Sequence, residues 1–152
     1  MADNAAVAQA IARHHAEMVQ QLSTLTEQLT HVIRHGDAWQ DVRDQIQGYA
    51  DRELLPHAAA EESTLYARGR DDATLIPLIE SLLAEHRALR RWRNRLVEAL
   101  DAAEALLAAG ALRALFTEHA GKEESWLLPG LVRRDVDLET ALGAMRSALA
   151  GS

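Results

Sequence analysis

The fold is decided by two nearly identical segments, His57-Ala-Ala-Ala-Glu61-Glu62-Ser63-Thr-Leu65 and His119-Ala-Gly-Lys-Glu123-Glu124-Ser125-Trp-Leu127. Each segment sets a His and a Glu four residues apart, which places both side chains on one face of an α-helix. Two single histidines complete the pattern, with His15 before the first segment and His86 between the two. A chain that alternates single His residues with helical His–Glu pairs is expected to build a metal site between four helices.

Apolar residues recur at spacings of three and four along two other stretches, as expected for the buried seam of a bundle helix. The first stretch contains Ile11, His15, Met18, Leu22, Leu25, Leu29 and Val32, and the later one contains Leu75, Ile79, Leu82, His86, Leu89, Leu96, Leu100 and Leu107. His15 and His86 take seam positions where Leu is expected, so both are predicted to point inward. His14 leaves the seam and is predicted to face outward or sideways.

Glycine, proline and capping residues predict where the helices end. Gly36-Asp37 is expected to end the first helix and cap the second, Gly69–Asp72 to separate the second from the third, and Pro129-Gly130 to end the fourth. The third turn has two candidates, Gly110 and the capping box Asp101-Ala-Ala-Glu104. If antiparallel helices bring their histidines to one level, each turn lies midway between successive histidines. This places the third turn near residues 101–104 and Gly110 inside the fourth helix.

The prediction is an all-α fold: an up-down-up-down four-helix bundle over about residues 5–130 and a short C-terminal helix over about residues 137–150, in one domain of residues 1–152. Pro56 is expected to bend the second helix. The C-terminal helix carries an apolar stripe of Leu138, Leu142, Met145 and Leu149. This stripe is expected to cover part of the bundle or to meet another subunit in a homo-oligomer.

Composition narrows the classes of function. The net charge of −7 argues against nucleic acid and anionic membranes as partners. The absence of Cys excludes disulfides, thiolate zinc sites and iron–sulfur clusters. The sequence shows no secretory signal and no apolar run of about eighteen residues, so a cytoplasmic location is expected.

Four imidazoles and two carboxylates are predicted to converge inside the bundle: His15, His57, Glu61, His86, His119 and Glu123. Six such ligands are too many for one closed zinc site and too rich in nitrogen for calcium or magnesium. They suit two first-row metal ions bridged by the carboxylates, with coordination positions left open. Two iron ions are the expected cofactor, and manganese or zinc are substitutes, because affinity order alone does not select iron.

With these residues the chain resembles the hemerythrin-like, or HHE cation-binding, family of four-helix diiron proteins over roughly residues 7–130. The marks of the resemblance are the two His-x-x-x-Glu-Glu phrases and the single His on the first and third helices. The resemblance implies a non-haem diiron centre that binds dioxygen, peroxide or nitric oxide. It also implies that the six residues named above occupy the ligand positions. Members of the family serve in oxygen binding, iron or oxygen sensing, peroxide removal and oxidative chemistry.

The sequence departs from the oxygen-carrying hemerythrins, which have a fifth His on the third helix. Here the positions four before and four after His86 are Leu82 and Arg90. One iron is therefore expected to lack a protein ligand and to take water, substrate or another side chain, which favours reactivity over simple carriage. Tyr49 and Tyr66 are the nearest candidates for this role by residue type. On an ideal helix they point about 80° and 180° from the direction of His57, so neither is predicted as a ligand.

Other polar residues near the repeats receive structural roles. Glu62 and Glu124 rotate about 100° from the preceding ligands and are predicted to lie around the site or at the surface. His31 and His35 lie too far along the first helix and are expected to offset its dipole. Trp126, seven residues after His119, is expected to line the metal pocket as part of the core.

Arg93 takes a seam position, which is unusual for a charged residue. It is expected to extend its head group to solvent or to neutralise a carboxylate such as Glu53.

The predicted function is a non-haem diiron protein that binds dioxygen or a related small oxidant, with oxidase or peroxidase chemistry as an open extension. The alternative is an iron- or oxygen-sensing module without catalysis. A haem protein would leave Glu61 and Glu123 buried without a role. A metal-free structural bundle would bury six polar side chains at a cost on the order of several kcal/mol.

Overall fold

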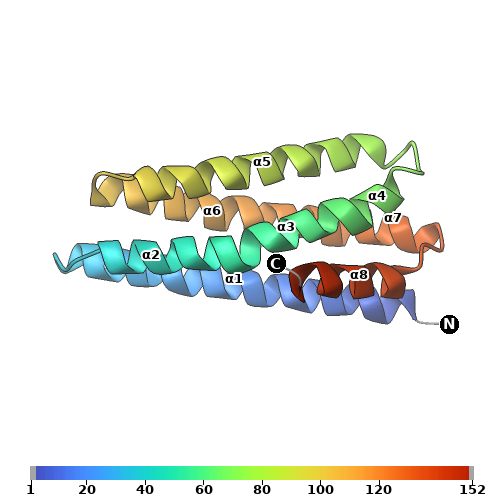
Figure 1. Ribbon diagram of the computed structural model, residues 1–152, viewed down its shortest axis with the longest axis horizontal. Coiled ribbons are helices and arrows are strands. Elements are labelled where there is room, and N and C mark those ends of the chain that lie inside the picture. Colours follow the sequence, from blue (N-terminus) through green and yellow to red (C-terminus); the bar gives the residue numbers. More distant parts are fainter. Residues whose placement is uncertain (1–2, 151–152) are drawn as a thin grey trace.

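The computed structural model describes residues 3–150, which form an up-down-up-down bundle of four long helices, as predicted (Figure 1). The first and third bundle helices are α1 (Asn4–Arg34) and α5 (Ile76–Glu98). The second runs through α2 (Gln40–Tyr49), η1 (Ala50–Leu54), α3 (Leu55–Glu61), η2 (Glu62–Tyr66) and α4 (Ala67–Gly69). The fourth runs through α6 (Ala102–Lys122), η3 (Glu123–Leu127) and α7 (Leu128–Arg133), and α8 (Leu138–Ala150) follows. Residues 1–2 and 151–152 of the predicted domain lie outside the described residues.

The first helix ends at Gly36, as predicted. Gly36 has a φ of 72°, and its N–H donates to the carbonyl of Ile33, while the N–H of Asp37 donates to the carbonyl of Val32. This left-handed ending satisfies the last carbonyls of the helix. The prediction that Asp37 caps the second helix is wrong, because α2 begins only after Trp39, whose side chain packs against the apolar core.

The third turn lies at Asp101, in agreement with the midpoint argument. The Asp101 carboxylate accepts from the N–H of Glu104 at 2.9 Å, and the Glu104 carboxylate accepts from the N–H of Leu100 at 2.8 Å. Gly110 lies inside α6. Leu100 and Leu107 do not belong to the buried seam, since they are 90% and 61% exposed. Leu100 lies in the turn after α5 has ended, and Leu107 falls on the outer face of α6.

Three π-helical segments, η1, η2 and η3, interrupt the second and fourth helices within residues 3–150. In a π-helix the hydrogen bonds join residues five apart, so each such turn holds about one residue more than an α-turn. The N–H of Leu55 donates to Ala50, just before Pro56, and the N–H of Leu128 donates to Glu123, just before Pro129. Since proline lacks an N–H and its ring crowds the preceding turn, a widened turn lets the helix continue.

The widened turns change two predictions about proline. The irregularity expected at Pro56 takes the form of the π-helical segment η1. The prediction that Pro129-Gly130 ends the fourth helix is wrong, because α7 continues to Arg133. The chain leaves the bundle only at Asp135, which adopts a φ of 54°.

Two apolar clusters lie on either side of the level of the His–Glu pairs. The distal cluster includes Met18, Leu22, Leu54, Leu89, Leu112 and Phe116. The proximal cluster includes Ile11, Tyr66, Leu82, Leu127, Leu138 and Met145. Along α1 and α5, His15 and His86 stand where one cluster gives way to the other. The polar layer is therefore sealed at both ends by packed side chains.

The C-terminal helix α8 packs against α1, α3 and η2 (Figure 1). Leu138, Ala141 and Met145 on its inner face are buried in the proximal cluster. The apolar stripe therefore covers the bundle of its own chain, as one of the two expectations held. Within residues 3–150, no helix is both long enough and apolar enough to cross a membrane.

Candidate metal centre

Six polar side chains meet at one level inside the bundle, and none of them is more than 2% exposed. They are His15 from α1, His57 and Glu61 from α3, His86 from α5, His119 from α6 and Glu123 from the start of η3. Every one of the six predicted ligands is thus brought to the same place. Because the four long helices each supply a histidine, the layer joins all walls of the bundle.

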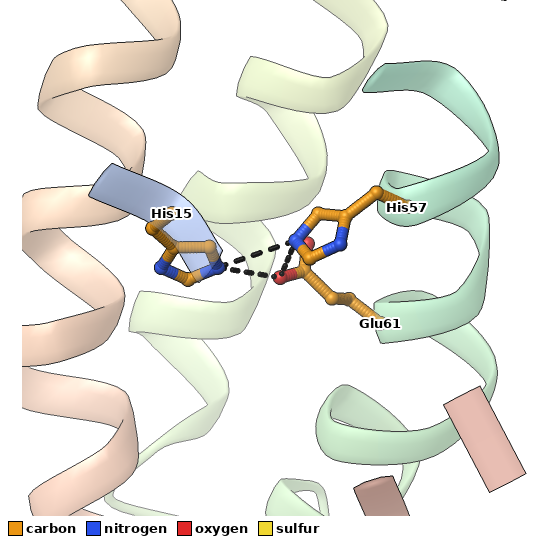
Figure 2. Close-up of side chains that lie close together, drawn as sticks. All are labelled: His15, His57 and Glu61. Carbon is orange, nitrogen blue, oxygen red and sulfur yellow. Dashed lines mark hydrogen bonds and ion pairs between the residues drawn. The ribbon is translucent and has the colours of Figure 1, made fainter. Parts of the chain in front are cut away.

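Glu61 lies between two groups of histidines. Its Oε1 is 3.2 Å from Nε2 of His15 and 2.8 Å from Nε2 of His57. Figure 2 marks both contacts with dashed lines. Oε2 of Glu61 is 3.4 Å from Nε2 of His86 and 3.9 Å from Nε2 of His119. Two sets of three donors result, each within 4.8 Å, and Glu61 belongs to both. We call the His15 and His57 side the α1/α3 half, and the His86 and His119 side the α5/α6 half.

Glu123 spans the same two halves. Its Oε2 is 3.5 Å from Nε2 of His15, and its Oε1 is 3.5 Å from Nε2 of His119. Each carboxylate therefore offers one oxygen to each half of the site. This is the arrangement that two bridging carboxylates require.

Carboxylates outside the site orient the histidines of the α5/α6 half. Nδ1 of His119 donates to Glu85 at 2.9 Å, and Glu85 is also bound by the ammonium of Lys122. Sequence reasoning missed both roles, because the repeated phrases do not show which residues of a neighbouring helix Glu85 and Lys122 face.

The second histidine of this half is held in the same way. Nδ1 of His86 donates to Glu62 at 2.9 Å, and Arg90 holds Glu62 at 3.0 Å. A proton on Nδ1 leaves a lone pair on Nε2, which in both histidines faces the site. Glu62 therefore lies outside the ring of donors, as predicted.

The α1/α3 half has weaker outer support. Nδ1 of His15 lies 3.3 Å from Glu124, whose side chain is 38% exposed. Nδ1 of His57 is buried and has no hydrogen-bond partner among the described residues. His14 is half-exposed, and its ring centre lies 5.2 Å from that of His57.

The donor atoms lie close together, and hydrogen bonds among them do not account for all of these contacts. Nε2 of His86 and Nε2 of His119 are 3.0 Å apart, although both lone pairs face the site. One oxygen each of Glu61 and Glu123 is buried without a hydrogen bond. Donors that are neighbours around one ion, each about 2.1 Å from it, lie roughly 3 Å apart. The residues therefore fit metal ions placed among them.

The carboxylates change the pKa values of the histidines. Burial, the strongest single influence, lowers the pKa of His119, but hydrogen bonds to Glu123 and Glu61 outweigh it and raise the pKa to about 10. Burial also raises the pKa of Glu61, yet the charge of His57 and hydrogen bonds from the surrounding histidines bring it well below its usual range. The buried charge of Glu61 thus needs a cation beside it, and a metal ion would supply that charge in place of a proton.

Tyr66 reaches the site, contrary to the prediction from an ideal helix. Its hydroxyl donates to Glu123 and lies 3.3 Å from Nε2 of both His86 and His119. The π-helical segment η2 is the reason, because residues five apart share a face in a π-turn and Tyr66 is five residues after Glu61. Burial and the charge of Glu123 raise the pKa of the phenol. Tyr66 therefore places a phenol oxygen beside the α5/α6 half.

The same geometry turns Trp126 away from the site. Its side chain is 66% exposed, whereas Leu127 is fully buried. The prediction that Trp126 lines the pocket is wrong, since the widened turn η3 shifts the inward position by one residue.

Arg93 does extend toward solvent, but its partner is Asp51, with two contacts of 2.7 Å, rather than Glu53. The ring centres of His31 and His35 lie 4.2 Å apart near the end of α1, with the ring planes tilted by 35°.

Comparison with known families agrees with this geometry. The family model described as hemerythrin HHE cation binding domain matches residues 6–145. The chain belongs to the hemerythrin HHE family. No curated protein and no solved structure matches it. The family's description names cation binding, and the buried His and Glu groups of this hemerythrin domain fit a metal site. The resemblance drawn from the repeated phrases is confirmed.

Proposed function

We propose that this hemerythrin HHE domain holds two iron ions and binds dioxygen or a related small oxidant, peroxide or nitric oxide. The observation that supports this most is the position of Glu61, whose two oxygens face two separate pairs of histidines. One ion would take His15 and His57, the other would take His86 and His119, and Glu61 and Glu123 would bridge them. Iron supplies the redox chemistry that oxygen binding needs, and manganese or zinc fits the same donors.

Tyr66 supports a further oxygen ligand on the α5/α6 half. The resemblance to oxygen-carrying hemerythrins implies that this half lacks a fifth histidine, because Leu82 and Arg90 stand at the matching positions. The Tyr66 hydroxyl donates to Glu123 beside both histidines. A nearby cation favours loss of the phenol proton, so Tyr66 would serve as an anionic donor when metal is present. Additional negative charge favours the higher oxidation state of the metal and hence reaction over reversible carriage.

The surrounding residues hold the donors and exclude water. Glu62 and Glu85 keep the proton of each imidazole on Nδ1, so that Nε2 stays available for a metal. The two apolar clusters close the layer from above and below.

The test is metal analysis of protein purified from iron-replete cells, with optical spectra before and after air is admitted. About two iron ions per chain and a charge-transfer band that appears with air are expected. A Soret band, or protein that keeps no metal when iron is supplied in excess, would contradict the proposal. Peroxide consumption in the same sample separates an enzyme from a carrier.

A sensing role is the second candidate, and the packing of α8 favours it. α8 contacts α3 and η2, the segments that carry His57, Glu61 and Tyr66. Metal loading that reduces the mobility of these segments would also reduce the mobility of α8. Limited proteolysis tests this role: cleavage between α7 and α8 that slows at least severalfold on metal loading supports sensing, and equal cleavage rates contradict it.

A further inference from the structure

Two exposed histidines at the C-terminal end of α1 take no part in the buried centre. His31 lies in the last turn of the helix, His35 is its C-cap residue, and both side chains are exposed. His31 follows His15 by sixteen residues, which corresponds to about 24 Å along the helix axis. Any ion held by this pair is therefore separate from the ions proposed for the buried centre.

The spacing of the two rings suits a shared ion. Residues four apart in a helix lie one above the other on the same face, and the ring centres of His31 and His35 are 4.2 Å apart. Two imidazoles bound to one ion, with bonds of about 2.1 Å, have ring centres roughly 4.5–5.3 Å apart. The proposed ligand pairs in the two halves of the buried centre stand at 5.2 Å and 4.6 Å. A small rotation of either exposed side chain brings His31 and His35 to the same spacing.

A hydrogen bond to the main chain already orients one of the rings. Nδ1 of His35 lies 2.8 Å from the carbonyl oxygen of His31, and a carbonyl can only accept, so Nδ1 carries the proton. Nε2 of His35 therefore keeps its lone pair. Histidines that bind metal ions are commonly held in this way, with the other ring nitrogen donating to a backbone carbonyl. The His31 imidazole forms no hydrogen bond or ion pair within residues 3–150, so its nitrogens are available as well.

The position at a helix end also favours a cation. The C-terminus of a helix carries a partial negative charge, which attracts positive charge in its last turn. The whole chain has a net charge of −7. Arg34 lies in the same turn, but its side chain is exposed and long enough to extend its guanidinium into water.

We propose that His31 and His35 form a second, exposed metal site for a divalent ion of the late first transition series. Nε2 of His35 and one ring nitrogen of His31 are the protein ligands, and water fills the remaining coordination positions. Imidazole nitrogen suits Cu(II), Ni(II) and Zn(II), and Cu(II) is expected to bind most tightly. Ca(II) and Mg(II) are not expected to bind, because they require oxygen ligands.

The first experiment measures partition of the full chain onto a resin that carries immobilised Cu(II). The resin reaches only surface imidazoles, and the four buried histidines are at most 2% exposed. His31→Asn and His35→Asn should each lower the partition coefficient at least about fivefold, because the second imidazole binds an ion that the first already holds. The half-exposed His14 is present in every variant, so its contribution is constant.

A matched control separates the pair from the number of surface histidines. His35→Asn combined with Gln20→His keeps the same number of exposed histidines on α1 but removes the spacing of four residues. This double variant should bind the resin no more tightly than His35→Asn. All substituted side chains are exposed, so each variant is expected to fold.

The second experiment locates the ion in solution by nuclear magnetic resonance. Cu(II), added beyond the capacity of the buried centre, should broaden the amide signals of residues 31–35 in the wild type and leave them sharp in the double variant. Equal partition of the wild type and the double variant would overturn the inference, as would sharp signals for residues 31–35 in the wild type. Because the resin does not reach the buried centre, the partition result is independent of the proposed function.

Discussion

The two halves of the site present similar donors to the interior but differ in what stands behind them. In the α5/α6 half, His86 and His119 each donate at 2.9 Å to a carboxylate that is itself paired with a cation, and Tyr66 adds an oxygen. In the α1/α3 half, His15 has one longer contact to a part-exposed carboxylate, and His57 has none. One half is therefore held firmly, and the other has little outer support.

This difference teaches that the repeated sequence phrase does not determine the strength of a site. Both phrases supply a His and a Glu one turn apart and a second Glu that faces a single histidine, yet His119 is held by Glu85 from outside the phrases and His57 has no such partner among the described residues. Outer hydrogen bonds orient a ligand and raise its basicity. We therefore expect unequal affinities, with the α5/α6 half binding metal more tightly.

Replacing Glu61, one of the two carboxylates that face both halves, should remove metal from both halves. In Glu61→Ala both halves lose a ligand, so we expect loss of both ions, an effect larger than the roughly 10–100-fold that outer partners contribute. Metal per chain after gel filtration measures this, with the exposed Glu27→Ala as the control. Retention of one ion at full occupancy would show that Glu61 is not shared.

Removing the outer carboxylates should reveal the difference between the halves. Glu85→Gln is expected to lower metal affinity roughly 10–100-fold, because it leaves the His119 imidazole without a charged acceptor. Glu124→Gln should cost less than about threefold, since Glu124 is part-exposed and its contact with His15 is long. Competition with a chelator gives both values. Equal losses in the two variants would contradict unequal support.

Tyr66→Phe tests the difference between the halves directly, because it removes the phenol oxygen that lies beside the α5/α6 half. We expect loss of any phenolate-to-metal band in the visible spectrum, with the fold retained because the ring still packs on His86. Tyr49→Phe is the matched control, since Tyr49 packs against the distal apolar cluster rather than beside the histidines. An unchanged spectrum in Tyr66→Phe would rule out the phenol as a ligand.

The smallest effect is expected far from both halves, at the pair of Arg93 and Asp51. Hydrogen bonds from Arg93 lower the pKa of Asp51, so the pair stabilises the fold above the unfolded pKa of about 3.9 and loses this contribution as the pH falls below it. Asp51→Asn should cost about 0.2–1 kcal/mol at pH 7. Urea unfolding of metal-free protein at pH 7 and pH 3 measures it, and a cost that persists at pH 3 would contradict the ionic origin.

Much of the fold followed from the sequence because the rise along a helix is constant. His15, His57, His86 and His119 meet at one level, and the turn at Asp101 falls where equal spacing requires. Distance along the axis is insensitive to one extra residue in a turn. The midpoint argument therefore survives the irregular segments of the second and fourth helices.

Rotation around the axis is sensitive to that extra residue, and here prediction failed. An ideal period of about 100° per residue placed Tyr66 outside and Trp126 inside, and both were reversed by π-turns. Pro56 and Pro129 signal irregularity nearby, but proline does not by itself say whether a helix ends, bends or widens. Glu85 was missed for another reason, since its role depends on which residue of a neighbouring helix it faces.

The widened turns have a consequence for anyone who transplants this centre into another scaffold. Ideal straight helices would reproduce the spacing of the His57–Glu61 pair and deliver its nitrogen and oxygen donors. They would leave the phenol of Tyr66 on the outside, because only η2 brings residue 66 to the azimuth of residue 61. A grafted centre must include the π-helical segments as well. Without them it will have the His and Glu residues of the original site but will lack the phenol oxygen beside them.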